Sequence, residues 1–141
     1  MHFRTDILIH ASPDRVWLVL RDFEHWPDWT PTVKSVRSLD KGPLRLGSRA
    51  VIRQPKLPPA KWKLIELDDA RRTFSWVTFG PGMQLIARFW VEEAGSDSRV
   101  TLSIQFSGFL GPLFARLTRD LNYRYLDLEA KGLRDHVEAR L

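Results

Sequence analysis

The stretch that decides the fold is ILIHASPDRVW, residues 7–17. It begins inside a run of β-branched and apolar residues that predicts a strand over residues 3–10. Ser12 belongs to the residue types that cap helix N-termini, and Pro13 suits the first helical position. The stretch therefore predicts a strand that passes directly into a helix.

A second helix is predicted in the stretch DFEHWPDWTP, residues 22–31. This helix is short, covering residues 23–29, because Pro31 prevents it from continuing. A strand followed by two short helices suggests a sheet wrapped around a helix, with a ligand cavity between them.

Alternating or apolar segments then follow at short intervals and predict six more strands, over residues 33–39, 48–54, 61–67, 73–79, 83–91 and 99–106. From residue 113 to 141 the apolar period becomes helical, with one stripe formed by Leu117, Leu121, Tyr125 and Leu128 and a second by Leu126, Ala130, Leu133 and Val137. A twisted antiparallel sheet with one apolar face needs a cover, and this helix is long enough to supply it. We therefore expect a single domain over residues 1–141 with an α+β helix-grip fold. It combines an antiparallel sheet of six to seven strands, a long C-terminal helix, and two short helices after the first strand.

The composition excludes several classes of protein. The 141 residues contain no cysteine, which rules out disulfides, thiolate metal sites and cysteine nucleophiles. No apolar run reaches the length that spans a membrane, and the N-terminal residues lack the apolar stretch of a signal peptide. We expect a cytoplasmic protein.

The net charge is +5, and the excess of cations is uneven. Residues 34–72 carry eleven Lys and Arg against four acidic residues. Such a segment could attract nucleic acid, anionic lipid or an acidic ligand. Because its charges alternate with apolar residues instead of clustering, we interpret it as a solvated outer face and expect no nucleic-acid partner.

These motifs resemble a known superfamily. Ile9–Trp17, Asp22–Trp29, the pair Gly47-Ser48 before a strand, and the long terminal helix are similar to the START-like superfamily. That superfamily includes the birch pollen allergen and the bacterial polyketide cyclase/dehydrase-type (SRPBCC) proteins. The resemblance implies binding of lipids, sterols, polyketides or plant hormones and, in some members, cyclisation or dehydration.

The candidate ligand-binding residues begin with large aromatic side chains, which suit the wall of a pocket for a flat or long apolar molecule. They are Trp26, Trp29, Trp62, Trp76 and Phe79. The alternative is that these rings simply fill the core.

The terminal helix adds further candidates, namely Leu117, Leu121, Asn122, Tyr125 and Glu129. Burying the Glu129 carboxylate without a partner is unfavourable, so it must meet a cation, reach water in a cavity, or lie at the edge. Arg53 and Arg88 are the candidate cations, and Arg88 is also a candidate ligand anchor.

Catalysis, if present, needs an acid–base pair, for which Glu129 with either Tyr125 or His25 is the candidate. The histidines lack metal-binding spacing and the serines lack the context of a nucleophile, so we expect no metal and no cofactor.

Three functions remain open from the sequence. The first is binding of a hydrophobic small molecule, such as a lipid, polyketide or aromatic metabolite, by a monomer or weak homodimer. The second is a polyketide cyclase or dehydratase activity. The third, ranked last, is an accessory role linked to ribosomes or quinones, with the basic segment as the contact.

Overall fold

The computed structural model describes residues 1–140. The N-terminal part contains β1 (His2–Ile9), α1 (Pro13–Arg21) and the 3-10 helix η1 (Phe23–Asp28). Six strands follow, namely β2 (Ser35–Ser38), β3 (Arg49–Arg53), β4 (Ala60–Asp68), β5 (Thr73–Gly80), β6 (Met83–Ala94) and β7 (Asp97–Ser107). The chain continues into α2 (Gly111–Leu117) and α3 (Arg119–Glu138). The predicted α+β helix-grip architecture is confirmed.

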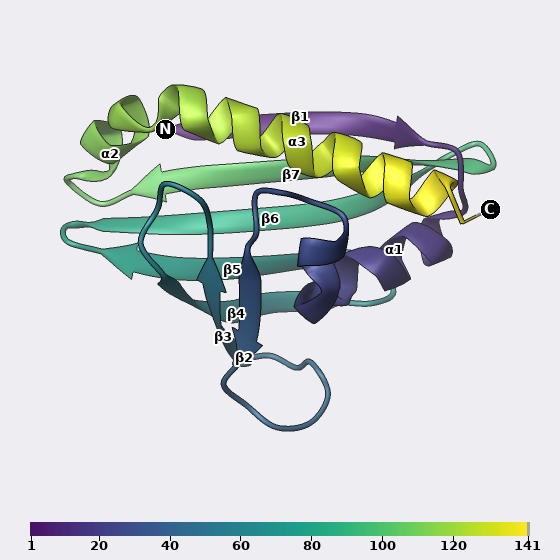
Figure 1. Ribbon diagram of the computed structural model, residues 1–141, viewed down its shortest axis with the longest axis horizontal. Helices are drawn as coiled ribbons and strands as arrows, with labels where there is room; N and C mark the ends of the chain where they lie inside the picture. Colours follow the sequence, from purple (N-terminus) through teal and green to yellow (C-terminus); the bar gives the residue numbers. More distant parts are fainter. Residues whose placement is uncertain (141) are drawn as a thin grey trace.

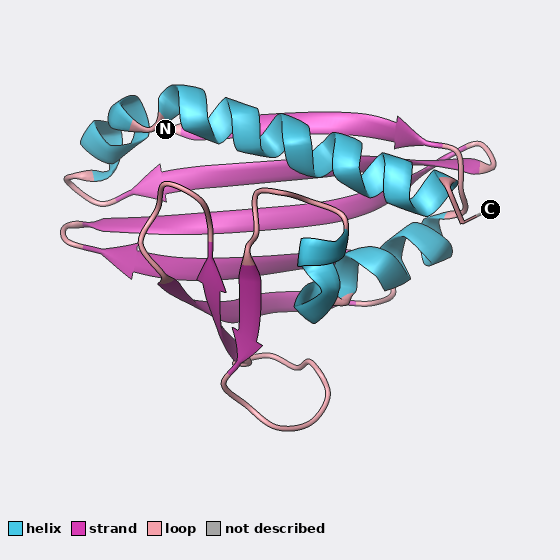
Figure 2. Cartoon of the chain, viewed as in Figure 1, coloured by secondary structure: helices cyan, strands magenta, loops and turns pink. Residues whose placement is uncertain are grey.

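All seven strands form one antiparallel sheet in the order β1-β7-β6-β5-β4-β3-β2. Figure 1 shows α3 running along the sheet over β1 and β7, with α1 beside its C-terminal end. Figure 2 shows that the helices gather on one side of the curved sheet. The apolar core therefore lies between the sheet and this helical layer.

The first helix forms as its sequence predicts. The Ser12 hydroxyl accepts a hydrogen bond from the Arg15 backbone N–H at 3.4 Å, and Pro13 occupies the first turn. Val16, Trp17 and Leu20 recur at helical spacing and are buried. The apolar face of α1 is thus fixed against the sheet and α3.

The predicted single terminal helix over residues 113–141 is wrong in one respect, because the helix is interrupted at Thr118. The Thr118 hydroxyl donates to the Phe114 carbonyl at 2.7 Å and accepts from the Asn122 amide at 3.0 Å. Side-chain bonds of this kind compete with regular helical bonding and bend helices. Residue 141 lies outside the described residues.

Two other element boundaries differ from the prediction. The strand expected over residues 33–39 covers only Ser35–Ser38, and the strands expected over residues 83–91 and 99–106 extend toward each other until only a tight turn separates them. Ala94 and Asp97 pair across that turn, so Gly95 and Ser96 alone connect β6 to β7. Gly95 has a φ of 66°, a conformation that favours glycine.

Gly132 explains how α3 approaches the N-terminal helices. A Cβ atom at this position would lie 2.0 Å from the Trp29 carbonyl oxygen. Any larger residue would therefore push α3 away from the segment that follows η1. The sequence places this glycine mid-helix, where it lowers helix propensity, and the close contact accounts for its presence.

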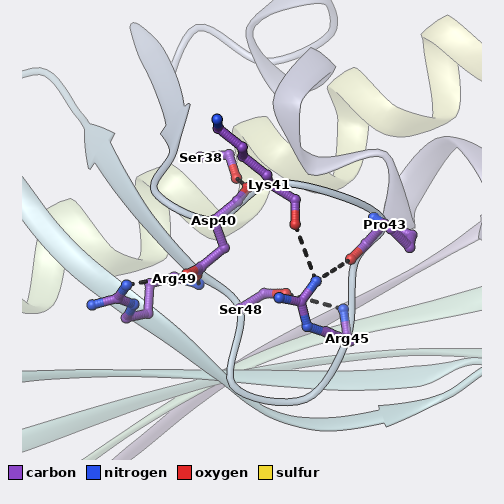
Figure 3. A network of polar contacts seen from close by, with 7 residues as sticks. All are labelled: Ser38, Asp40, Lys41, Pro43, Arg45, Ser48 and Arg49. Carbon is purple, nitrogen blue, oxygen red and sulfur yellow. Dashed lines mark hydrogen bonds and ion pairs between the residues drawn. The ribbon is translucent and has the colours of Figure 1, made fainter.

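The β2–β3 loop, residues 39–48, is held by polar contacts (Figure 3). The Asp40 carboxylate accepts from the Arg49 backbone N–H at 2.7 Å and from its guanidinium at 3.1 Å. Hydrogen bonding to Arg49 lowers the pKa of Asp40 below its ordinary value. The Arg45 N–H donates to the Ser48 hydroxyl at 3.0 Å, and the Arg45 guanidinium donates to the Lys41 carbonyl at 3.1 Å.

Within residues 1–140, no helix combines the length and the apolar content that crossing a membrane requires.

Candidate functional site

A cavity of about 90 Å³ lies between the sheet and α3. This space is several times the roughly 10–15 Å³ that one water molecule needs. The sheet, η1 and two loops supply apolar residues to its wall, namely Trp26, Val33, Ile52, Leu57, Trp62, Trp76, Leu85, Ala87, Phe89 and Ile104. Gln54 and four α3 residues, Asn122, Tyr125, Leu126 and Glu129, complete it. The cavity is thus mostly apolar, with its polar groups concentrated on α3.

The strand register explains why space remains there. Ile104, Ala87 and Trp76 lie opposite one another on β7, β6 and β5 and face α3. In the next row the equivalent position on β6 is Phe89, between Leu102 and Phe74. Because Ala87 is small, the row beneath the cavity does not fill the distance to the helix.

Glu129 is the group with the most perturbed chemistry in the cavity wall. Desolvation by burial raises the pKa of its carboxyl to about 8. Among residues 1–140, no side chain or backbone group forms a hydrogen bond or ion pair with this carboxyl. With this raised pKa the neutral form of the carboxyl is favoured at pH 7, and it offers an unused O–H donor to the cavity.

Tyr125 lies one helical turn before Glu129 on the same face of α3. Its hydroxyl donates to the Pro55 carbonyl, which ties the helix to the loop over residues 54–59. Burial raises the pKa of Tyr125, and the nearby Glu129 raises it further, while Arg124 lowers it. Asn122, another turn back, donates to Thr118.

Two indole N–H groups in the cavity wall are also without partners. Trp62 and Trp76 have buried Nε1 atoms that make no hydrogen bond among the described residues, whereas Trp26 donates to the Leu20 carbonyl at 2.8 Å. Buried indole N–H groups usually find a partner. These donors, together with Glu129, distinguish the site from a fully satisfied core.

The structure brings six of the predicted ligand-binding residues together in this wall, namely Trp26, Trp62, Trp76, Asn122, Tyr125 and Glu129. Leu121 is half-buried on α3 but is not among the residues that line the cavity. The other predicted residues lie elsewhere.

Phe79 and Arg88 lie on the outer face of the sheet, because strand neighbours alternate and Trp76 and Phe89 face inward. Arg88 donates to Glu66 at 3.1 Å and stacks on Trp90, with its guanidinium carbon 4.8 Å from the ring centroid. Arg53 is exposed on β3, one residue after the inward Ile52. Neither arginine is therefore a partner for Glu129.

Leu117 is exposed at the end of α2, because the interruption at Thr118 breaks the helical phase that the sequence extrapolates. The second predicted stripe, Leu126, Ala130, Leu133 and Val137, is buried as expected.

His25 and Trp29 border a different hollow of about 280 Å³, between α1, η1 and the C-terminal end of α3. The exposed His25 ring pairs with Asp22 at 2.8 Å, and this hydrogen bond raises its pKa. Trp29 is buried there near His136, whose pKa is lowered by burial. The structure therefore does not place His25 beside Glu129.

Several cations of the basic segment are paired. Arg49 pairs with Asp40, Arg71 with Asp68, and Arg72 with Asp14. The other eight Lys and Arg of residues 34–72 form no ion pair among the described residues.

Sequence reasoning missed nine lining residues, namely Val33, Ile52, Gln54, Leu57, Leu85, Ala87, Phe89, Ile104 and Leu126. Ile52, Gln54 and Leu57 lie at the end of β3 and in the loop after it, where the strand alternation predicts Ile52 and Gln54 on one face. Leu85, Ala87, Ile104 and Leu126 carry no chemical signal in the sequence and are found only from register and packing.

Comparison with known proteins identifies the family. The sequence model of the family described as polyketide cyclase / dehydrase and lipid transport matches residues 1–138. The chain belongs to this family. This match confirms the resemblance to the polyketide cyclase/dehydrase-type (SRPBCC) proteins. A search of curated proteins finds no match.

The solved structures show how widely the fold is shared. The Zhui aromatase/cyclase of Streptomyces sp. R1128 superposes with a TM-score of 0.80 at 19% identity, over 99% of this chain and 94% of that one. A protein from Thermus thermophilus gives 0.76 at 21% identity, over 99% of both chains. A point mutant of norcoclaurine synthase from Thalictrum flavum gives 0.78 at 18% identity, over 99% of this chain and 95% of that one. At these identities the comparison establishes the fold alone.

Proposed function

We propose that this protein of the polyketide cyclase/dehydrase and lipid transport family binds a small apolar molecule that carries one hydrogen-bond acceptor. The ligand lies in the cavity between the sheet and α3. Its acceptor atom accepts a hydrogen bond from the protonated carboxyl of Glu129. The observation that carries the proposal is a carboxyl in a mostly apolar wall that has no hydrogen-bond partner among the described residues and whose pKa is raised by burial to about 8.

The chemistry of the wall supports this ligand class. Trp26, Trp62, Trp76 and Phe89 present aromatic surface that suits a flat ring. A cavity of about 90 Å³ favours a ligand the size of a substituted ring over a long lipid chain, unless α3 or the loop over residues 54–59 moves. A neutral carboxyl in this setting discriminates against anions, because a negative ligand would be desolvated without a counter-charge.

A matched pair of probes tests the proposal. Acetophenone and ethylbenzene have nearly the same shape, but only the ketone accepts a hydrogen bond. We expect the protein to bind acetophenone about fivefold more tightly at pH 6, the value of one ordinary hydrogen bond. This preference should disappear above pH 9, where Glu129 is ionised and no longer donates.

Three variants separate the cavity from the hydrogen bond. E129Q keeps an N–H donor and should keep the preference for the ketone at every pH. E129L should bind both probes without preference, and A87L should weaken both because the added side chain occupies the cavity. If neither probe binds the wild-type protein, or if E129L keeps the preference for acetophenone, the proposal is wrong.

A second candidate function is acid–base catalysis of a cyclisation or dehydration in the same cavity. It is favoured by a neutral carboxylic acid one helical turn from a tyrosine hydroxyl, since an acid with a pKa near the working pH is an effective proton donor. Two of the structural neighbours are named as aromatase/cyclases, which makes a linear poly-β-ketone the first substrate to try. In this role Glu129 donates the proton and Tyr125 orients the substrate.

Turnover of such a substrate by E129Q decides between binding and catalysis. Loss of turnover with unchanged substrate affinity would support catalysis by Glu129. The H25N variant is the matched control and should turn over at the wild-type rate, because His25 lies outside the cavity. Equal turnover by E129Q and wild type would remove the catalytic role.

A further inference from the structure

One end of the molecule exposes large apolar side chains. This end is formed by the β5–β6 turn, the β7–α2 loop and α2, which lie together in Figure 1. Phe109, Leu113 and Leu117, which we call the apolar tip, are respectively 85%, 51% and 73% exposed. Exposed apolar residues gathered in one region mark an interaction surface more often than isolated ones do.

The helix α2 turns two of its large apolar side chains outward. Its buried residues are the small Gly111 and Ala115, and Phe114 packs partly against the core. Leu113 and Leu117, about one turn apart, are exposed. A surface helix normally turns its leucines to the core and its polar residues to water. The leucines of α2 therefore contribute little to folding and are available to a partner.

The apolar tip is held outward by a formed structure. The Leu110 N–H donates to the Gly82 carbonyl at 2.9 Å, and the Gly111 N–H donates to the Gly108 carbonyl at 3.0 Å. Gly82 has a φ of 65°, and a Cβ atom there would lie 2.8 Å from Leu110 and 2.9 Å from Phe109. The two connections are thus fitted to each other, which fixes Phe109 at the surface.

Cations outnumber acidic residues around the apolar tip. Arg116 on α2, Arg119 at the start of α3 and Lys61 at the start of β4 are exposed. Asp120, the residue after Arg119, is the neighbouring acidic side chain and is also exposed. The acidic residues of α1 and of the β4–β5 and β6–β7 turns lie at the opposite end.

We propose that the apolar tip docks on an anionic lipid bilayer, with Phe109, Leu113 and Leu117 entering the interfacial region and the flanking cations facing the lipid phosphates. Apolar side chains from the β7–α2 loop and α2, flanked by Arg116 and Arg119, match the requirements of a surface that is both fluid and negative. A second copy fits less well, because a symmetric contact through this end would bring Arg116 and Arg119 of both copies together. The proposal does not depend on what the cavity binds.

Vesicle co-sedimentation of the full chain tests this docking. The probes are vesicles of phosphatidylcholine alone and vesicles in which roughly a third of the lipid is phosphatidylglycerol. We expect binding to the anionic vesicles and weak binding to the neutral ones, with the anionic partition coefficient falling as salt rises. Each neutralised cation near the surface should lower that coefficient about fivefold.

The variants assign the surface. R116Q/R119Q should reduce binding to anionic vesicles about 25-fold, and L113N/L117N should reduce it at every salt concentration. The matched controls are R71Q and L18N, whose residues are exposed at the opposite end and on α1, and both should bind as the wild type does. Circular dichroism confirms that each variant is folded.

Two results would overturn the proposal. One is that the wild-type protein fails to bind anionic vesicles at low salt, or that the apolar-tip variants bind as well as the controls. The other is a concentration-dependent dimer in sedimentation velocity that L113N/L117N abolishes while vesicle binding is unaffected, which would make the apolar tip a self-association surface.

Discussion

Because of the Glu129 carboxyl, the free energy of unfolding of this protein should fall as pH rises. The fall occurs in a pH range where most carboxyl groups are already ionised and have no effect on stability. The pKa of Glu129 is about 8 in the folded protein, against an ordinary value of 4.5 that applies to the unfolded chain. Between these values the folded state holds a proton that the unfolded state lacks, so the free energy of unfolding decreases as pH rises. The slope is about 1.4 kcal/mol per pH unit for one such group.

The size of the effect follows from the two pKa values. The contribution of protonated Glu129 to stability is fully present below its pKa in the unfolded chain. It is lost as pH rises through its pKa in the folded protein. Relative to low pH, the difference between the two pKa values lowers the free energy of unfolding by about 3 kcal/mol at pH 7 and by about 5 kcal/mol in the limit of high pH. These amounts are a large fraction of the stability of a typical domain.

The E129Q variant removes this titration while nearly preserving the side-chain shape. Urea unfolding, followed by tryptophan fluorescence from pH 5 to pH 8, gives the free energy of unfolding of both proteins. We expect the advantage of E129Q over the wild type to grow by about 3 to 4 kcal/mol over this range.

E66Q is the matched control, because hydrogen bonds from Ser75 and Arg88 lower the pKa of Glu66. The stabilising contribution of Glu66 is present above the pKa of this carboxyl in the unfolded chain and is lost only as pH falls below that pKa. The difference in free energy of unfolding between E66Q and the wild type should therefore be constant from pH 5 to pH 8. A constant difference for E129Q as well would show that Glu129 is ionised in the folded protein and would refute the reasoning.

Three other predictions follow from particular contacts. G132A should destabilise the protein by several kcal/mol in urea unfolding, because the new Cβ collides with the Trp29 carbonyl. This loss outweighs the advantage of alanine as a helix former, which is about 1 kcal/mol. A neutral or stabilised variant would disprove the collision. Y125F should lower stability by about 1 kcal/mol and speed hydrogen exchange in the loop around Pro55, since it removes the bond that ties this loop to α3; unchanged exchange would mean that the bond does not hold the loop. R88A should leave acetophenone affinity unchanged in a calorimetric titration, because this side chain lies on the outer face of the sheet; a large loss of affinity would contradict that placement.

The fold was predictable because local signals agree with one another along most of this chain. The Ser12-Pro13 helix start, the alternating strands and the apolar stripe through Leu133 each have a direct physical meaning. The break at Thr118 was not predictable in this way, because it depends on a side-chain bond that competes with the helix over one turn. That break is the reason Leu117 lies outside the cavity.

The candidate site was predictable only where chemistry and periodicity coincide. Glu129 and Tyr125 combine a polar group with an inward helical position, so the sequence indicates them. Phe79 and Arg88 could have been excluded, because strand alternation with the inward Trp76 and Phe89 places both on the other face. Ala87, whose small size leaves space for the cavity, has no distinguishing feature until its neighbours in the sheet are known.

The indole N–H resonances of the six tryptophans test the central claim most directly. Trp26, Trp62 and Trp76 line the cavity, whereas Trp17 and Trp90 lie away from it and Trp29 borders the other hollow. In a proton–nitrogen spectrum titrated with acetophenone, we predict saturable shifts of the three cavity resonances and no shift of those from Trp17 and Trp90. Unchanged cavity resonances at saturating probe, or shifts confined to Trp29 and Trp90, would contradict the account.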